Sequence, residues 1–332
     1  MHIAHLPGSL IVLALTAVTF SLGGCGGGGG GDAAASPAST VPVTTPTPVT
    51  TPTPVGTPVT TPTPTPVTTP TPTPVTTPIP ATTPTPAPTV GQIWRPMVTD
   101  TWQWQLTGTL NTTYDVKVYD IDLYDTSATT ILALQNRGMK VLCYFSAGSS
   151  ENWRADFTSF AAADMGNALD GWAGERWLDT RSGNVRAIMK QRLDLAKSKG
   201  CDGVEPDNVD GYTNNPGFAL TASTQLDYNR FLASEAHARG LAIALKNNVD
   251  QVADLVGDFD LAVNEQCHQY KECGAYAAFV SAGKPVFNAE YAKSYQAAGS
   301  ARDTLCLDAT KLGLRTLVLP LALDGSARFS CD

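Results

Sequence analysis

Acidic residues stand at the ends of several short apolar runs in the last two thirds of this 332-residue sequence. In the motif GVEPD, Glu205 and Asp207 are two positions apart, so on a β-strand both side chains would point to the same face. Gathering carboxylates at one place costs free energy through desolvation and mutual repulsion, which a purely structural set of residues would avoid. The residues concerned are Asp120, Asp122, Glu205, Asp207, Glu265 and Glu290. We therefore take these positions as the candidate active site.

The residue sets of other common chemistries are missing from residues 91–332. This part holds two histidines, His237 and His268, which excludes a zinc site of three histidines. It contains no G-x-S-x-G, no G-x-x-x-x-G-K and no G-x-G-x-x-G motif. Asp207 and Asp210 could hold a cation such as calcium, but their spacing is not that of an EF-hand, and we predict neither a metal nor a cofactor. Paired carboxylates favour cleavage of a glycosidic bond, the reaction that depends on such a pair alone.

Eight runs of apolar and β-branched residues are the elements that would position these carboxylates. They alternate with segments of helical periodicity, several of which close on a glycine, as is common where a helix ends. The alternation predicts an α/β fold, a (β/α)8 barrel of the TIM type, with a doubly wound open sheet as the alternative. In such a barrel the carboxyl ends of the strands carry the catalytic groups. The predicted strands are 102–106, 116–122, 140–146, 203–207, 241–246, 260–265, 285–290 and 315–320.

Two helical segments, 184–199 and 224–239, show which face would be buried. The connection 147–202 is too long for one helix, so we expect it to carry additional structure at the active site. The expected buried residues are Val185, Ile188, Met189, Leu193 and Ala196 in the first helix, and Leu226, Phe231, Leu232 and Ala236 in the second.

Composition divides the chain near residue 90. Residues 1–90 contain 19 of the 24 prolines and none of the 22 lysines and arginines, so the folded domain is expected at 91–332. A chain of about 240 residues can build one large hydrophobic core. This domain has 22 basic and 29 acidic residues, which argues against a nucleic-acid partner and allows a cationic or neutral one.

The amino terminus has the pattern of an exported lipoprotein. Residues 10–22 form an apolar run that is too short to span a bilayer comfortably, and Leu-Gly-Gly-Cys follows at 22–25. We expect a signal peptide at 1–24 and lipidation of Cys25, which would anchor the protein to a membrane at the cell surface or in the periplasm. The alternative is an ordinary secretory signal cleaved nearby, because the segment before the apolar run lacks Lys and Arg.

Residues 25–90 are expected to be a linker. Glycines fill 26–31, and VTTPTP-like units repeat over 37–90. Each proline fixes φ and lacks an N–H, so this stretch can form neither a helix nor the interior of a sheet. We expect a disordered spacer of extended polyproline II character that places the domain away from the anchoring surface.

Several segments of the domain resemble glycoside hydrolase family 114. The resemblance covers essentially all of residues 94–300 and is most specific in EPDNVDGY followed by NEQC. The matching segments are VYDIDLYDT (118–126), VLCYFSAGSSENWRAD (141–156), GWAGERWLD (171–179), GCDGVEPDNVDGY (200–212), LKN (245–247), NEQC (264–267) and AEY (289–291). The family members that this chain resembles are endo-α-1,4-polygalactosaminidases with a (β/α)8 barrel, which act on partly or fully de-acetylated galactosamine polymers.

The resemblance implies roles for two carboxylates, since the family's nucleophile matches Asp207 and its acid/base matches Glu265. In a retaining mechanism, Glu265 protonates the leaving oxygen while Asp207 attacks the anomeric carbon, and Glu265 then activates the water that releases the product. The two carboxyl groups would lie about 5–5.5 Å apart, whereas a separation above roughly 6.5 Å would indicate inversion. A substrate with protonated amines would also suit the acidic charge of the domain.

Other residues of the same segments are expected to bind substrate or to support the pair. Trp153 and Trp172 could stack on sugar rings or belong to the core, and Tyr144 could equally be packed inside the barrel. The remaining candidates are Asp122, Tyr144, Glu205, Asp210, Lys246, Asn247, Asn264, Glu290 and Tyr291.

Six cysteines remain once Cys25 is assigned to the lipid, an even number that fits disulfide bonds in an exported protein. Six cysteines allow 15 pairings, and the sequence does not choose among them. The candidate pairs are Cys267 with Cys273 and Cys306 with Cys331, while Cys143 and Cys201 either pair or stay as buried thiols.

Two other functions stay open at this point. One is a different retaining glycosidase, for example an α-galactosidase-like enzyme acting on a neutral sugar. The other is a surface carbohydrate-binding protein that no longer catalyses, against which the presence of both Asp207 and Glu265 argues. We expect the protein to act as a monomer on its polysaccharide.

Overall fold

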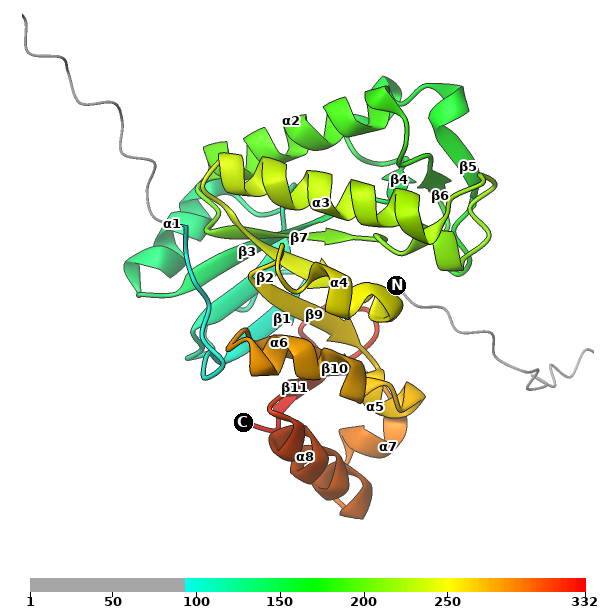
Figure 1. The fold of residues 1–332 in the computed structure, drawn as a ribbon. Coiled ribbons are helices and arrows are strands. Elements are labelled where there is room, and N and C mark those ends of the chain that lie inside the picture. The colour runs from blue at the N-terminus through cyan, green and yellow to red at the C-terminus, as the bar shows by residue number, and fades with distance from the viewer. Residues whose placement is uncertain (1–92) are drawn as a thin grey trace, which may run out of the picture. The chain divides into compact units, whose positions relative to one another are not determined.

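The computed structural model describes residues 93–332 (Figure 1). The predicted signal peptide at 1–24, the lipidation site Cys25 and the linker at 25–90 lie outside the described residues. Among the described residues, no helix combines the length and the apolar character needed to cross a membrane. The fold therefore bears on the domain predicted at 91–332.

A curled nine-stranded sheet forms the centre of this domain (Figure 1). Its order is β1-β2-β3-β7-β8-β9-β10-β11-β12; the first eight strands are parallel to their neighbours, and β12 is antiparallel to β11. The eight predicted strands are confirmed, with small differences at their ends. Their bounds are β1 (Trp102–Gln105), β2 (Val118–Asp122), β3 (Lys140–Ser146), β7 (Gly203–Asp207), β8 (Ala242–Lys246), β9 (Leu261–Glu265), β10 (Val286–Glu290) and β11 (Arg315–Val318), followed by β12 (Phe329–Ser330).

Side chains along the parallel strands alternate between two cores. In β9, Leu261 and Val263 belong to an inner core enclosed by the curled sheet, whereas Ala262 belongs to an outer core between the sheet and the helices. Glu265, at the end of β9, therefore continues the inner series. Strands buried on both faces read as continuous apolar runs, which is why the sequence predicts them well.

The two ends of the parallel sheet meet. The indole N–H of Trp102 in β1 donates to the backbone oxygen of Arg315 in β11 at 2.9 Å, and Arg328 donates to the backbone oxygen of Trp102 at 2.9 Å. The Trp102 ring also stacks on Phe287 of β10, with 4.9 Å between ring centroids. These contacts join β1 to the far edge, so the α/β fold is barrel-like.

Helices cover the outside of the sheet (Figure 1). Both predicted helices are confirmed, and α2 ends on Gly200, whose φ of 89° suits a left-handed C-cap. The five residues predicted to be buried in α2 are buried; in α3, Leu226 and Phe231 are only half-buried, because Tyr228 occupies the inward face. The bounds are α1 (Ala128–Asn136), α2 (Gly183–Lys199), α3 (Ala222–Ala238), α4 (Val252–Leu255), α5 (Cys267–Tyr270), α6 (Ala277–Ser281), α7 (Lys293–Gln296) and α8 (Ser300–Leu312).

The sequence predicts a regular alternation of strands and helices, but the structure departs from it at one connection. Residues 106–117, between β1 and β2, form a loop. The long connection after β3 does carry extra structure, a small antiparallel sheet in the order β4-β6-β5. Its strands are β4 (Ser149–Glu151), β5 (Met165–Ala168) and β6 (Glu175–Leu178), and short 3-10 turns lie at Phe157–Ser159, Ala162–Asp164, Gly211–Thr213, Val249–Gln251 and Cys273–Tyr276.

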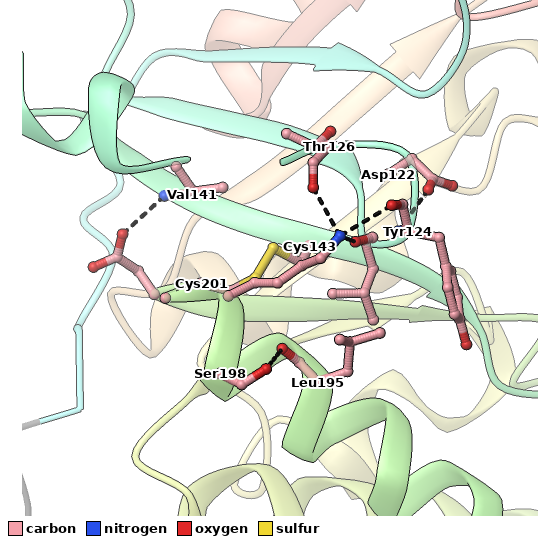
Figure 2. The surroundings of a disulfide bond; sticks show 12 residues. Asp122, Tyr124, Thr126, Val141, Cys143, Leu195, Ser198 and Cys201 are labelled. Carbon is pink, nitrogen blue, oxygen red and sulfur yellow. Dashed lines mark hydrogen bonds between the residues drawn. A yellow bond between two sulfur atoms is a disulfide. The ribbon is translucent and has the colours of Figure 1, made fainter. Parts of the chain in front are cut away.

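Three disulfides fasten the fold: Cys143–Cys201, Cys267–Cys273 and Cys306–Cys331. The first, shown in Figure 2, links β3 to the residue that follows the C-cap of α2. Both candidate pairs from the sequence are thus present, and the pair that had been left open is bonded as well.

Candidate active site

A buried lysine stands at the carboxyl ends of three neighbouring strands. Lys246, the last residue of β8, is 2 % exposed. Its ammonium nitrogen lies 3.0 Å from Glu205 Oε1, 3.2 Å from Asp207 Oδ1 and 3.5 Å from Glu265 Oε2. Burial disfavours the charged form, but the three carboxylates outweigh it and raise the pKa of Lys246 well above its usual value. The site therefore contains a stable cation that holds three acidic groups together.

Asp207, the last residue of β7, accepts hydrogen bonds on both carboxylate oxygens. The backbone N–H of Asn208 donates to Oδ1 at 2.7 Å, and the hydroxyl of Tyr144 in β3 donates to Oδ2 at 3.0 Å. Burial alone would raise the pKa of Asp207, but the charge of Lys246 and these two hydrogen bonds lower it below its usual value. Asp207 is therefore ionised, the state in which a carboxylate can attack carbon.

Glu265, the last residue of β9, is oriented through both of its carboxyl oxygens. The hydroxyl of Tyr291 donates to Oε1 at 2.6 Å, and the side-chain amide of Asn247 donates to Oε2 at 3.1 Å. The side-chain oxygen of Asn247 in turn accepts the backbone N–H of Glu265 at 2.9 Å. These contacts fix the orientation of the Glu265 carboxyl group next to Lys246.

The backbone turns sharply after each of these three strands. Asn208, Asn247 and Gln266 have φ angles of 61°, 45° and 63°, in the left-handed region that residues other than glycine seldom adopt. They directly follow the three residues just described. Such conformations cost free energy and cluster at functional sites, where the surrounding contacts hold them.

Two further carboxyl groups lie within the sheet beside Lys246. Asp120 of β2 and Glu205 of β7 are fully buried. Burial raises the pKa of Glu205 to about 7, although the charge of Lys246 opposes the shift. Burial and the charge of the neighbouring Glu205 raise the pKa of Asp120 well above its usual value, so the protonated form of Asp120 is favoured. The pair supports Lys246 from inside the barrel-like sheet.

A cavity of about 250 Å³ opens beside these groups. Its wall includes Trp153 and Trp172, the two tryptophans expected either to stack on sugar rings or to belong to the core; they are 54 % and 37 % exposed and so lie outside the core. Trp104 forms part of the same wall, and its ring centroid lies 4.7 Å from the ammonium of Lys246. Predicted site residues that line the cavity are Asp122, Tyr144, Asp207, Lys246 and Glu265.

The other predicted site residues are buried around the cavity without lining it. Asn264 and Glu290 belong to the outer series of their strands, which points away from the cavity. Glu290 accepts the backbone N–H of His268 at 2.9 Å, and burial raises its pKa to about 7. Asn247 and Tyr291 can act on a substrate only through Glu265. The six residues placed behind the wall are Glu205, Asp210, Asn247, Asn264, Glu290 and Tyr291.

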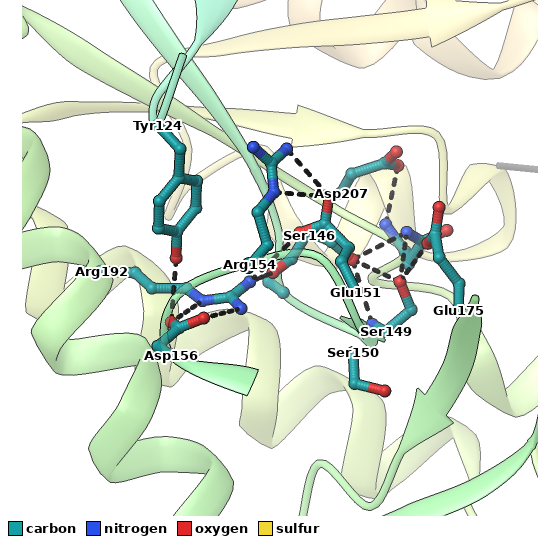
Figure 3. Close-up of polar contacts among 12 residues, drawn as sticks. Tyr124, Ser146, Ser149, Ser150, Glu151, Arg154, Asp156, Glu175, Arg192 and Asp207 are labelled. Carbon is teal, nitrogen blue, oxygen red and sulfur yellow. Dashed lines mark hydrogen bonds and ion pairs between the residues drawn. The ribbon is translucent and has the colours of Figure 1, made fainter. Parts of the chain in front are cut away.

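The connection between β3 and α2 adds wall residues that the sequence did not single out (Figure 3). Arg154 binds Asp122 through two nitrogens, at 3.1 and 2.6 Å, and donates to Glu151 at 2.9 Å. Glu175, on β6, lines the cavity beside them. The available signal was their position within two segments that carry the family resemblance, VLCYFSAGSSENWRAD and GWAGERWLD.

Comparison with known proteins gives relatives of this domain. The model of glycoside-hydrolase family GH114 matches residues 83–332. Ega3 from Aspergillus fumigatus, solved in complex with galactosamine, is 43 % identical; the match covers 72 % of this chain and 98 % of Ega3, with a TM-score of 0.69. The glycoside hydrolase domain of PelA from Pseudomonas aeruginosa, 15 % identical, shares the fold with a TM-score of 0.54 over 68 % of this chain and 96 % of that domain. No curated protein matches the chain.

Proposed function

Since this chain belongs to glycoside hydrolase family GH114 and is a glycoside hydrolase, we propose that it cuts α-1,4 bonds within galactosamine-containing polysaccharides. One observation carries the proposal: the ammonium of Lys246 contacts both Asp207 and Glu265 in the wall of an open cavity. Glycoside hydrolysis needs two such carboxyl groups. The choice of polymer is supported by Ega3, whose structure holds galactosamine.

The proposed reaction proceeds in two displacements with retention. Asp207 attacks the anomeric carbon while Glu265 gives its proton to the leaving oxygen, which breaks the glycosidic bond and forms a glycosyl ester on Asp207. Glu265 then takes a proton from water, whose oxygen attacks the same carbon and restores the carboxylate of Asp207. Ionised Asp207 suits the first step, and Lys246 holds both groups throughout.

The spacing of the two carboxyl groups supports retention. The Lys246 nitrogen lies 3.2 Å from Asp207 Oδ1 and 3.5 Å from Glu265 Oε2, so these two oxygens are no farther apart than the sum of the distances. This limit accommodates the roughly 5–5.5 Å of retaining enzymes and leaves out most of the roughly 6.5–9.5 Å range of inverting ones.

The cavity wall also suits a cationic sugar chain. The exposed faces of Trp153 and Trp172 offer stacking surfaces for sugar rings. Acidic side chains next to them raise the local concentration of a polycation and orient it. The wall contains Asp122, Asp125, Glu151 and Glu175 in addition to the catalytic pair.

We infer that the curled sheet is a (β/α)8 barrel of the TIM type whose first connection, 106–117, has a loop in place of a helix. Eight parallel strands in sequential order and the contact between Trp102 and Arg315 across the two edges support this assignment. The position of Asp207, Lys246 and Glu265 at carboxyl ends of strands agrees with it, because active sites of such barrels lie there.

The proposal is tested by incubating the purified protein with polygalactosamine and, separately, with a neutral galactan, and by analysing the products by mass spectrometry. Galactosamine oligosaccharides are expected from the first polymer. Asp207→Asn and Glu265→Gln should abolish turnover while binding persists. Products from the galactan alone would indicate an α-galactosidase-like enzyme, and binding without any product would indicate a non-catalytic carbohydrate-binding protein.

We further propose that the protein is a monomer, exported and anchored through a lipid on Cys25, with 25–90 as the spacer. The pattern at 10–25 supports this, and three disulfides suit an oxidising compartment. Cys25→Ser should move the protein from the membrane fraction to the soluble fraction of cells. An unchanged distribution would rule out this anchor, and a dimer in light scattering would rule out the monomer.

A further inference from the structure

Glu175 is a carboxylate of the cavity wall that lacks a cationic partner among the described residues. It begins β6, is 7 % exposed and lines the cavity. The hydroxyl of Ser149 donates to its Oε2 at 2.5 Å (Figure 3). Within 93–332, no lysine, arginine or histidine forms an ion pair with it, and no hydrogen bond reaches its Oε1. One oxygen of a nearly buried carboxylate is thus left for something that enters the cavity.

The other buried carboxylates of the wall each face a basic side chain. Asp122 and Glu151 share Arg154, which lies 2.6 and 2.9 Å from them. The catalytic pair shares Lys246. The cavity therefore compensates its negative charges from within the protein, and Glu175 departs from this rule.

The surroundings of Glu175 make its isolation costly. The register of β4 and β6 places Glu151 directly opposite Glu175, an arrangement of like charges that destabilises a strand pair. Burial, together with the charges of Glu151 and Asp207, raises the pKa of Glu175 to about 7 against the opposing hydrogen bond from Ser149. A cation brought by a ligand would remove this cost.

We propose that Glu175 binds the protonated amine of a galactosamine unit and thereby selects de-acetylated sugar. This role rests on the proposed function, in which the substrate is a galactosamine polymer, and makes Glu175 the residue that recognises the amine. An ammonium near Oε1 would form a charge-assisted hydrogen bond in a largely desolvated place, where such bonds are strong. An N-acetyl group carries no charge, so it would leave the carboxylate uncompensated and cost free energy on binding.

The test measures binding by calorimetry at pH 7 in the Glu265→Gln background, which leaves the ligand uncut. The ligands are a galactosamine trisaccharide and its fully N-acetylated counterpart. Adding Glu175→Gln removes the charge but keeps an oxygen for Ser149, and it should weaken binding of the galactosamine trisaccharide roughly 10- to 100-fold. Binding of the acetylated trisaccharide should not weaken. Asp170→Asn, exposed on the same insertion and outside the cavity wall, is the matched control and should change neither.

The outcomes separate this inference from the proposed function. Equal affinities with and without Glu175→Gln, or an equal loss for both trisaccharides, overturn the role of Glu175 while hydrolysis by the wild-type protein still supports the proposed function. A wild-type protein that neither cuts polygalactosamine nor binds its trisaccharide overturns both.

A second measurement does not depend on the folding of a Glu175 variant. In the Glu265→Gln background, affinity for the galactosamine trisaccharide should rise several-fold from pH 6 to pH 7 as Glu175 loses its proton. Among residues 93–332, the charged groups that act on the pKa of Glu175 are Glu151 of β4 and Asp207 of β7. The N-acetylated trisaccharide is the control: a change in its affinity with pH would measure any effect of Glu151 or Asp207 on binding that does not involve the amine. Affinity that stays constant over this range, or that rises equally for both ligands, overturns the proposal.

Discussion

The hydroxyl of Tyr144 donates a 3.0 Å hydrogen bond to Asp207 Oδ2, the oxygen opposite the one that Lys246 contacts. The two residues stand on neighbouring strands, β3 and β7. Burial raises the pKa of Tyr144 well above its usual value, so the hydroxyl stays a neutral donor over the range in which enzymes work. Tyr144 thus stabilises the ionised form of Asp207 from the side that the lysine does not reach.

Tyr144→Phe should move the acid limb of the pH–rate profile to higher pH. The variant loses a donor to the carboxylate, so the pKa of Asp207 rises, by about one to two units if the bond contributes as others to charged groups do. The measurement is kcat/KM on polygalactosamine across pH 3–8. Tyr119→Phe, whose hydroxyl bonds the backbone of Tyr114 away from the cavity, should leave the profile unchanged. An unmoved acid limb in Tyr144→Phe would show that Lys246 alone sets the state of Asp207.

Lys246→Met should lose activity and stability together. Three carboxylates that share one ammonium would be left without it, and breaking a buried ion pair in this way costs about 3–5 kcal/mol of the free energy of unfolding. Urea unfolding at pH 7 measures the loss. Lys190→Met, which removes a half-exposed partner of Glu235, should cost about 1 kcal/mol or less. Equal costs for the two variants would contradict the central position of Lys246.

Glu290→Gln should become more stable than the wild type as pH rises. Burial raises the pKa of Glu290 from 4.5 to about 7, so the folded state holds the proton more tightly, and the stability it contributes at low pH is lost between about pH 4.5 and 7. Glu290→Gln does not undergo this loss. Its free energy of unfolding relative to the wild type should therefore be about 1–3 kcal/mol higher at pH 8 than at pH 4. Unfolding curves of both proteins at the two pH values test it.

Glu235→Gln provides the control of opposite sign. Lys190 and Arg239 lower the pKa of Glu235, so its contribution is present at neutral pH and is lost as pH falls through that lowered pKa. This variant should be slightly less stable than the wild type at pH 8. If both glutamate variants respond to pH alike, a change of net charge explains them and the burial of Glu290 does not.

The Cys143–Cys201 disulfide should stabilise the domain more than Cys267–Cys273. The paired cysteines are 58 residues apart in the first disulfide and 6 in the second. Because a disulfide restricts the unfolded chain more when it closes a longer loop, the expected stabilisation is about 4 kcal/mol for the first and about 2 kcal/mol for the second. Replacing each pair by alanine and comparing the free energies of unfolding measures both. The reverse order would mean that contacts in the folded state outweigh the effect on the unfolded chain.

The strands and the location of the candidate site could be predicted from the sequence because their signals are local. Apolar runs mark strands buried on both faces, and acidic residues at their ends mark the site, whereas the roles expected of Asp207 and Glu265 came from the family resemblance. Alternation within a strand also explains a failure: Asn264 and Glu265 are adjacent, so they must point to opposite faces, and only Glu265 reaches the cavity. The same rule separates Glu290 from Tyr291.

The wall built by the insertion could not be derived in this way. Glu175 reaches the cavity because β6 pairs with β4 and β5, and such pairings between distant residues leave no periodic signal in a single segment. Trp104 lies on β1, where nothing in the sequence indicates that its ring meets the charge of a lysine more than a hundred positions away. Half-buried Leu226 and Phe231 show the same limit, since Tyr228 takes the place that their spacing suggested.

The small sheet of β4, β5 and β6 forms its ladder separately from the nine-stranded sheet. The residues proposed for bond cleavage and for choice of sugar thus lie in different structural units: Asp207 and Glu265 belong to the barrel-like scaffold, and Glu175 belongs to the small antiparallel sheet. Substitutions in that unit can alter which polymer is accepted without disturbing the reacting carboxylates. Enzymes that separate the two units in this way can change their substrate specificity while the reaction they catalyse stays the same.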